Sequence, residues 1–435
     1  MLNLYYYRVF LLINSAILFA VYVAFGLNND VTPYSYIYLL LINVYMLLRS
    51  RQNFLLFIVF FIIFYSNYSI VYSNFIVKND DTMFTDVLSQ RTQFVSLNIL
   101  VLFNLLIFLL VKWRDVSPHS DENIYLSKEK NDKTPIIILG IILVIVFFVG
   151  FQLPEEEGAR GNPSSIYEYS VIFFILYFYY TGESRLFKGI GLIFVLMYSL
   201  QNFIFGGRIY GIQFLLTAYI MNFMYKTSMY KVVVGITLMF FLFSIIGVVR
   251  GELMSMNFSL GNIFSLILNR GFALDTAYSA YYTSESFVYM DERLDDKMIP
   301  IRLFGEFLKS IIIGSGDNPD SVLPTVTHEY VTHYNGGILP FYLYFYLGAF
   351  GILLVAILTS FYINMIISLV AHSSSIKKCI TVWIASTTFR WYLYGPLPLL
   401  RGVLLLVLCY YLFAYILFEW NRICKGLKAP SREIV

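Results

Sequence analysis

Four arginines in or near apolar runs are the residues best suited, by type and position, to take part in chemistry. Arg208 follows two glycines, Arg250 ends an apolar run, Arg270 lies in the apolar part of a long loop, and Arg390 lies inside an apolar run. A guanidinium group binds phosphate oxygens in a forked, bidentate geometry. The four residues therefore predict a pyrophosphate site. The alternative is that each one snorkels or pairs with a nearby carboxylate.

The stretch 328–333 reads His-Glu-Tyr-Val-Thr-His and holds the other candidate residues. It differs from the zinc-protease motif H-E-x-x-H, in which both histidines lie on one helix face. Here the histidines are one position further apart, so they point about 140° away from each other on a helix. We therefore expect no metal site and interpret His333 or Glu329 as a general base that deprotonates a hydroxyl group. The alternative is a pair of solvated loop histidines.

Motifs that bind nucleotides are missing from the sequence. It contains no Asp-x-Asp pair, no Walker loop and no dinucleotide-binding loop. This disfavours nucleotide-sugar chemistry and ATP-driven transport, and we expect no cofactor. The net charge of +3 gives no indication of a nucleic-acid partner.

The elements that must position these residues are membrane helices. The chain of 435 residues is 59% hydrophobic and 13% charged, whereas a soluble domain carries about 25% charged residues. Its apolar residues form runs of about 20, the length that crosses a bilayer core. The sequence predicts an all-α polytopic membrane protein with about twelve transmembrane helices. They lie at roughly 5–27, 33–48, 54–77, 92–111, 135–152, 166–181, 189–205, 209–225, 232–249, 339–368, 379–394 and 397–419.

Lys and Arg residues set the predicted orientation, because basic loops stay in the cytoplasm. With the N-terminus in the cytoplasm, every inside loop is basic and the short outside loops are poor in Lys and Arg. Both termini are then cytoplasmic. The chain divides into N-terminal helices (1–249), a large extracytoplasmic loop (250–338), and C-terminal helices with a cytoplasmic tail (339–435).

One segment of the large loop, 301–313, has the pattern of a short amphipathic helix. Such a helix lies on the membrane surface or caps the spans. Its predicted apolar face comprises Ile301, Phe304, Leu308 and Ile311.

Four short motifs follow one another between about residues 201 and 355. They are Gly206-Gly207-Arg208, Val249-Arg250-Gly251, Leu268-Asn269-Arg270-Gly271 and Asn335-Gly336-Gly337-Ile338-Leu339-Pro340. Their order and spacing, with one large outside loop, resemble the oligosaccharide repeat-unit polymerases, the Wzy family. The register around His333 is looser than that around the arginines. The resemblance implies a metal-free, GT-C-like membrane glycosyltransferase in the bacterial inner membrane.

The resemblance also implies a reaction and partners. Such an enzyme transfers a growing glycan from undecaprenyl pyrophosphate onto a new lipid-linked repeat unit at the periplasmic face. Donor and acceptor are both undecaprenyl-pyrophosphate-linked oligosaccharides within membrane lipid, and a chain-length regulator is an expected partner. The arginines would neutralise the pyrophosphate leaving group without a cation.

Two other functions fit parts of the sequence. An O-antigen ligase shares the class and the donor but transfers the glycan to the lipid A core. A lipid-linked oligosaccharide flippase also has about twelve spans, but it needs no long outside loop and carries charges near the midplane of several helices. The gathering of charges at the predicted outer face favours the polymerase.

Overall fold

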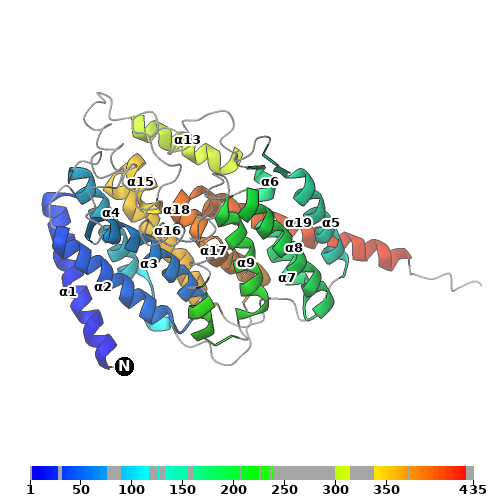
Figure 1. The fold of residues 1–435 in the computed structure, drawn as a ribbon, viewed down its shortest axis with the longest axis horizontal. Coiled ribbons are helices and arrows are strands. Elements are labelled where there is room, and N and C mark those ends of the chain that lie inside the picture. The colour runs from blue at the N-terminus through cyan, green and yellow to red at the C-terminus, as the bar shows by residue number, and fades with distance from the viewer. Residues whose placement is uncertain are drawn as a thin grey trace, which may run out of the picture. The chain divides into compact units, whose positions relative to one another are not determined.

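The computed structural model is mostly helical (Figure 1). It describes residues 2–27, 32–75, 90–116, 126, 133–154, 161–205, 207–224, 227–228, 230–235, 238, 299–313, 338–369 and 373–427. Four of the predicted site residues lie outside these ranges, so their roles stay predictions. They are Arg250, Arg270, Glu329 and His333.

Apolar helices occur over most of the predicted spans. In chain order the described elements are α1 (Leu2–Phe25), α2 (Thr32–Ser50), α3 (Phe54–Phe75), α4 (Gln90–Leu110), η1 (Trp113–Asp115), α5 (Lys133–Val149), β1 (Phe151–Gln152), β2 (Asn162–Pro163), α6 (Ser165–Glu168), α7 (Ser170–Thr181), α8 (Arg185–Phe205), α9 (Arg208–Asn222), α13 (Ile299–Ile313), α15 (Leu339–Leu347), α16 (Ala349–Ile367), α17 (Ser375–Ser386), α18 (Thr388–Tyr394) and α19 (Leu397–Leu427). The predicted span 232–249 lies mostly outside the described residues.

Within the described ranges, four helices are long and apolar enough to cross a membrane. They are Tyr5–Phe25, Arg185–Phe205, Ala349–Ile367 and Leu397–Trp420. Shorter apolar helices, such as Val95–Leu110 and Lys133–Val149, accompany them. The apolar helices therefore indicate a multi-pass membrane protein, and the number of twelve spans stays a prediction.

Three predicted spans are each built from two helices rather than one. The breaks fall at Tyr169, at Gly348 and at Thr387. At Gly348 the backbone has φ +59°, a conformation that residues with a Cβ rarely adopt. Three residues later, a Cβ on Gly351 would lie 1.8 Å from the Leu343 carbonyl oxygen. Glycine at these two positions lets α16 fold back closely on α15.

The chain forms two compact units. Unit 1 comprises Met1–Asp121, Met229–Ser368 and Thr387–Leu400, and unit 2 comprises Glu122–Ser228, Leu369–Ser386 and Arg401–Val435. In unit 1, α2 packs on α3 and α4, and α4 also packs on α16. In unit 2, α7 packs on α5 and α9, and α8 packs on α9.

A buried polar network joins four helices of unit 1. Asn67 on α3 donates through Nδ2 to Asn43 Oδ1 on α2 (3.1 Å) and to Asn104 Oδ1 on α4 (3.2 Å). Tyr392 on α18 donates to Asn67 Oδ1 (2.7 Å). Asn43 and Asn104 use their own amide groups to donate to carbonyl oxygens one turn earlier in their helices. Interhelical hydrogen bonds of this kind stabilise helix packing in a membrane.

One end of unit 1 gathers segments that the sequence predicts on the same side of the membrane. The Arg49 guanidinium donates to the Trp113 carbonyl oxygen from Nε (3.1 Å) and from Nη2 (2.9 Å). The Lys112 amide donates to Asn364 Oδ1 (2.8 Å). These bonds bring the C-terminal ends of α2, α4 and α16 together, as the alternating topology requires. Which end faces the cytoplasm stays a prediction.

The amphipathic helix predicted at 301–313 is present as α13. It packs on α15 in unit 1, where the Phe307 and Tyr346 rings stack with centroids 5.5 Å apart. Phe307 and Ser310 are buried, whereas Leu308 from the predicted apolar face is 46% exposed. The buried face is therefore rotated from the predicted one, because it follows the contact with α15 rather than the apolar stripe alone.

Stacked aromatic rings form the core of unit 2. Tyr167 on α6 stacks on Tyr198 on α8, with centroids 4.9 Å apart, and Phe174 and Phe214 meet Tyr198 edge-on. The Tyr167 hydroxyl donates to Gln201 Oε1 (2.8 Å). Ring contacts of this kind add stabilisation beyond burial of their area. These contacts hold α6 against α8 at one end of the unit.

Candidate functional site

Arg208 is the first residue of α9, one residue before the predicted start of a span at 209. The preceding residue, Gly207, is the N-cap and has extended backbone angles (φ −88°, ψ 122°). A Cβ on Gly207 would lie 2.9 Å from the Tyr210 ring, so the absence of a side chain permits this close approach. The structure describes the backbone of Arg208 and not its side chain.

Arg390 lies on α18 in unit 1 and is partly buried. Its backbone amide donates to the Thr387 carbonyl oxygen (2.9 Å) at the break between α17 and α18. Tyr392, two residues later, joins α18 to the asparagine network. Arg208 belongs to unit 2, so the two described arginines are in different units. The predicted four-arginine cradle therefore stays a prediction.

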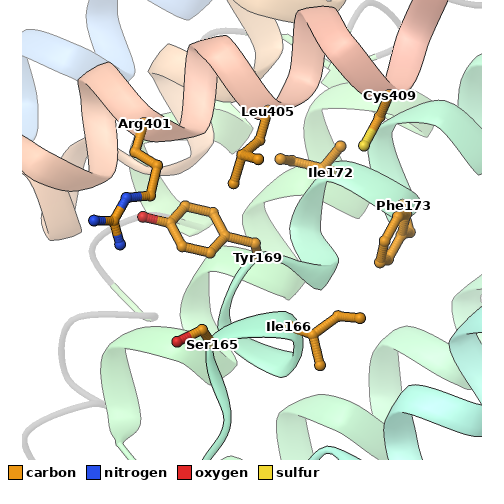
Figure 2. Close-up of a pocket in the computed structure, with 8 residues that line it drawn as sticks. All are labelled: Ser165, Ile166, Tyr169, Ile172, Phe173, Arg401, Leu405 and Cys409. Atoms are coloured by element: carbon orange, nitrogen blue, oxygen red, sulfur yellow. The ribbon is translucent and has the colours of Figure 1, made fainter. Parts of the chain in front are cut away.

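Unit 2 contains a cavity of about 240 Å³ between α6, α7 and α19 (Figure 2). It is lined by Ser165, Ile166, Tyr169, Ile172, Phe173, Arg401, Leu405 and Cys409. Pockets for drug-sized ligands measure about 300–1,000 Å³. The cavity is thus suited to one part of a long ligand rather than to a whole one.

The exposed lining of the cavity is almost wholly apolar, and its polar side chains gather on one side. Figure 2 shows Arg401, Tyr169 and Ser165 toward one side, with the Tyr169 hydroxyl pointing toward the Arg401 guanidinium. Ile172, Leu405 and Cys409 lie toward the other side. A cation beside hydrocarbon walls suits a ligand with an anionic head and an apolar tail.

The short helix α6 places Ser165 and Tyr169 at the cavity. Ser164 is its N-cap, and the Ser164 side chain accepts a hydrogen bond from the Tyr167 amide (3.4 Å). Such caps satisfy amides that the first helical turn leaves without partners. The Tyr167 hydroxyl also accepts from Asn202 Nδ2 (2.8 Å), which holds α6 against α8.

The start of α9, where Arg208 lies, is at the same end of unit 2 as the cavity. The Tyr210 hydroxyl donates to Glu168 Oε1 (2.5 Å), and Glu168 directly precedes Tyr169. Nearby, the Gly161 amide donates to the Phe205 carbonyl oxygen (2.7 Å) at the end of α8. The structure therefore brings one sequence-predicted arginine position to the end of the unit that carries Arg401.

Sequence reasoning missed Arg401 and Tyr169. Arg401 lies near the start of an apolar helix, just after the Gly395–Pro396 break, and the argument that selected Arg390 applies to it equally. Tyr169 carries no comparable signal, because it is one of 37 tyrosines. Only the fold brings residues 169 and 401 to one cavity.

The comparisons with known proteins give no independent assignment of the site. No protein-family model, curated protein or solved structure matches the chain. Among the residues that the structure describes, no three His, Cys, Asp or Glu side chains gather in a group that could hold a metal ion. The site is therefore interpreted from the residues of this chain alone.

Proposed function

We propose that the chain is a glycosyltransferase that polymerises lipid-linked oligosaccharide repeat units. It transfers the growing glycan from a polyprenyl pyrophosphate carrier onto a new lipid-linked unit. The observation that carries the proposal is the cavity of unit 2, in which Arg401 stands beside apolar walls. A polyprenyl pyrophosphate has this same division, with a dianionic or more highly charged head and a hydrocarbon tail.

The chemistry of the transfer assigns a task to a guanidinium. The bond between the anomeric carbon of the donor and its phosphate oxygen breaks, and a bond from that carbon to an acceptor hydroxyl oxygen forms. The electron pair leaves on the pyrophosphate, and the hydroxyl proton passes to a base, for which His333 or Glu329 is predicted. A fixed cation at the phosphate stabilises the negative charge that develops on the leaving group.

Two arginines of unit 2 form the proposed headgroup site. Arg401 lines the cavity, and Arg208 begins α9 at the same end of the unit. The predicted topology puts this end outside the cytoplasm, where the carrier presents its oligosaccharide. Arg250, Arg270 and Arg390 stay predicted pyrophosphate ligands, contributed by the outside loop and by α18 of unit 1.

The finer features of the proposal follow from the apolar runs, the basic loops and the resemblance in the sequence. They are a GT-C-like arrangement of about twelve spans, a bacterial inner-membrane location, cytoplasmic termini and a chain-length regulator as partner. The O-antigen ligase is the second candidate, because it uses the same donor and would need the same cavity. The two differ in the acceptor alone.

The test of the proposal is Arg401→Ala in cells whose own copy of the gene is deleted. Loss of one charge-stabilising contact lowers the rate by about 10²–10³, so the ladder of glycan lengths on a gel should collapse to single repeat units. Arg401→Lys should retain part of the ladder, because lysine keeps the charge and loses the fork. Protein levels are measured by immunoblotting in parallel.

Arg422→Ala is the matched control on the same helix. Arg422 is exposed and pairs with Glu419 at 3.3 Å, far along α19 from the cavity. This variant should make a full ladder. Full-length polymer retained on the carrier in the deletion strain would indicate the ligase instead. A full ladder from normally expressed Arg401→Ala would contradict the proposed role of the cavity.

A further inference from the structure

Tyr169, which lines the cavity, belongs to an aromatic stack. Tyr169 stacks on Trp383 of α17, with ring centroids 6.2 Å apart and planes inclined by 16°. Trp383 is 1% exposed, and a Cβ on Gly402 would lie 2.0 Å from one of its indole carbons. The backbone of α19 therefore lies directly against the indole, and the indole meets both α19 and Tyr169.

This stack brings the Tyr169 ring and the backbone next to Arg401 against one indole. Gly402 directly follows Arg401, so the contact with Trp383 sets the distance of the Arg401 Cα from α17. The Tyr169 ring rests on the same indole, and its hydroxyl points toward the Arg401 guanidinium (Figure 2). The buried tryptophan thereby fixes the Tyr169 ring and the α19 backbone beside Arg401 relative to each other.

We propose that Tyr169 is a positioning residue that orients the Arg401 guanidinium for a diphosphate headgroup. Trp383, packed against Gly402, holds the Tyr169 ring in place. The inference rests on the proposed function in taking an isoprenoid diphosphate as the occupant. It adds the residue that sets selectivity for the charged head over an uncharged one.

The physical reason is preorganisation. An arginine side chain has many rotamers, and ordering it at the moment of binding weakens affinity. A neighbouring hydroxyl that already orients the guanidinium removes part of this cost, whereas it does nothing for the apolar contacts of the tail. Removal of the hydroxyl should therefore weaken binding of the diphosphate and leave binding of the matching alcohol unchanged.

The test uses Tyr169→Phe in the full-length, detergent-solubilised protein. Phenylalanine keeps the ring that stacks on Trp383 and removes only the hydroxyl. Dissociation constants for farnesyl diphosphate and for farnesol are measured by titration calorimetry. The diphosphate should bind roughly tenfold more weakly, about the effect of one polar contact, and farnesol should bind as before.

Trp383 fluorescence separates this role from a general structural one. The emission of Trp383 is obtained as the difference between wild type and Trp383→Phe. Tyr169→Phe should leave that emission unchanged, because the stack remains, whereas Tyr169→Leu should shift it. Equal weakening of farnesyl diphosphate and farnesol by Tyr169→Phe, or no weakening of either, would overturn the inference.

Binding of the two isoprenoids to the wild-type protein, read together with the glycan ladder, shows whether this inference or the proposed function has failed. A wild-type protein that binds the two isoprenoids equally would overturn both, because the cavity would then recognise no diphosphate. Suppose instead that the wild-type protein prefers the diphosphate and that Arg401→Ala still makes a full glycan ladder. These results would contradict polymerisation at the cavity and leave the positioning role of Tyr169 intact. The binding measurement does not depend on the identity of the sugars.

Discussion

The asparagine network of unit 1 and the cavity region of unit 2 use polar groups in different ways. In unit 1 the amide of Asn67 joins three helices, and Tyr392 adds a fourth. In unit 2 stacked rings such as Tyr167 on Tyr198 fill the core, and a cavity remains beside Arg401. The first arrangement uses polar groups to join helices by hydrogen bonds. The second places Arg401 at the side of a largely apolar cavity.

A buried amide shows the same difference. Asn67 is 1% exposed, and both its oxygen and its nitrogen have partners in other helices. Gln213 on α9 of unit 2 is 0% exposed, and neither atom of its amide has a hydrogen-bond partner within the described part of the chain. A buried amide without partners is destabilising. The Asn67 amide thus stabilises helix packing in unit 1, whereas the Gln213 amide does not stabilise unit 2.

The largest effect on folding is expected from Gly402→Ala in unit 2. A Cβ at this position would meet the Trp383 indole at 2.0 Å, and the buried ring has little room to move. Such overpacking should lower the free energy of unfolding by about 3 kcal/mol. Unfolding in mixed detergent–SDS micelles measures it. Gly189→Ala is the control, because its Cβ meets nothing within 4 Å. Equal free energies of unfolding for the two variants would contradict the close packing of Trp383 against Gly402.

A smaller loss is expected from Asn67→Leu in unit 1. The change removes three interhelical hydrogen bonds of the network. Hydrogen bonds between membrane helices average about 0.6 kcal/mol each, which gives a loss of about 2 kcal/mol. Combining Asn67→Leu with Tyr392→Phe in a double-mutant cycle should show coupling between the two residues. Strict additivity would mean that α18 is not held by this network.

The smallest effect is expected from Gln213→Leu in unit 2, and its sign is opposite. Replacing an amide without partners by an apolar group of similar size removes a desolvation penalty and should raise the free energy of unfolding by about 1 kcal/mol. The same micelle assay measures it. A clear loss of stability would show that Gln213 has a partner in the folded protein, and the contrast with Asn67 would disappear.

Much of the fold was predictable because hydropathy acts locally. The runs at 92–111 and 189–205 closely match α4 (Gln90–Leu110) and α8 (Arg185–Phe205). The break at Gly348 was not predictable from hydropathy, because the apolar composition continues through it. The break at Thr387 coincides with the polar run Ser386-Thr387-Thr388, which is too short to interrupt the predicted span. A glycine at positive φ and a close contact with another helix are properties of the packed chain. Hydropathy therefore predicts where helices lie better than where they break.

The candidate site was less predictable, since it depends on distant segments. Arg208 and Arg390 were identified because an arginine in or beside an apolar run is conspicuous. Tyr169, Trp383 and Arg401 come from three segments that only the fold brings together. The asparagines of unit 1 were likewise predictable as polar residues in apolar runs, but not as one network.

The most direct test of the lipid-diphosphate cavity is protection of Cys409, which lines its apolar side. With Cys379 and Cys424 replaced by serine, a maleimide reagent reports on Cys409 alone. Farnesyl diphosphate should slow labelling strongly, farnesol less, and inorganic pyrophosphate not at all, because only a ligand with a tail reaches the thiol. Arg401→Ala should remove the advantage of the diphosphate over the alcohol. Equal labelling rates with and without farnesyl diphosphate would contradict the assignment of this cavity.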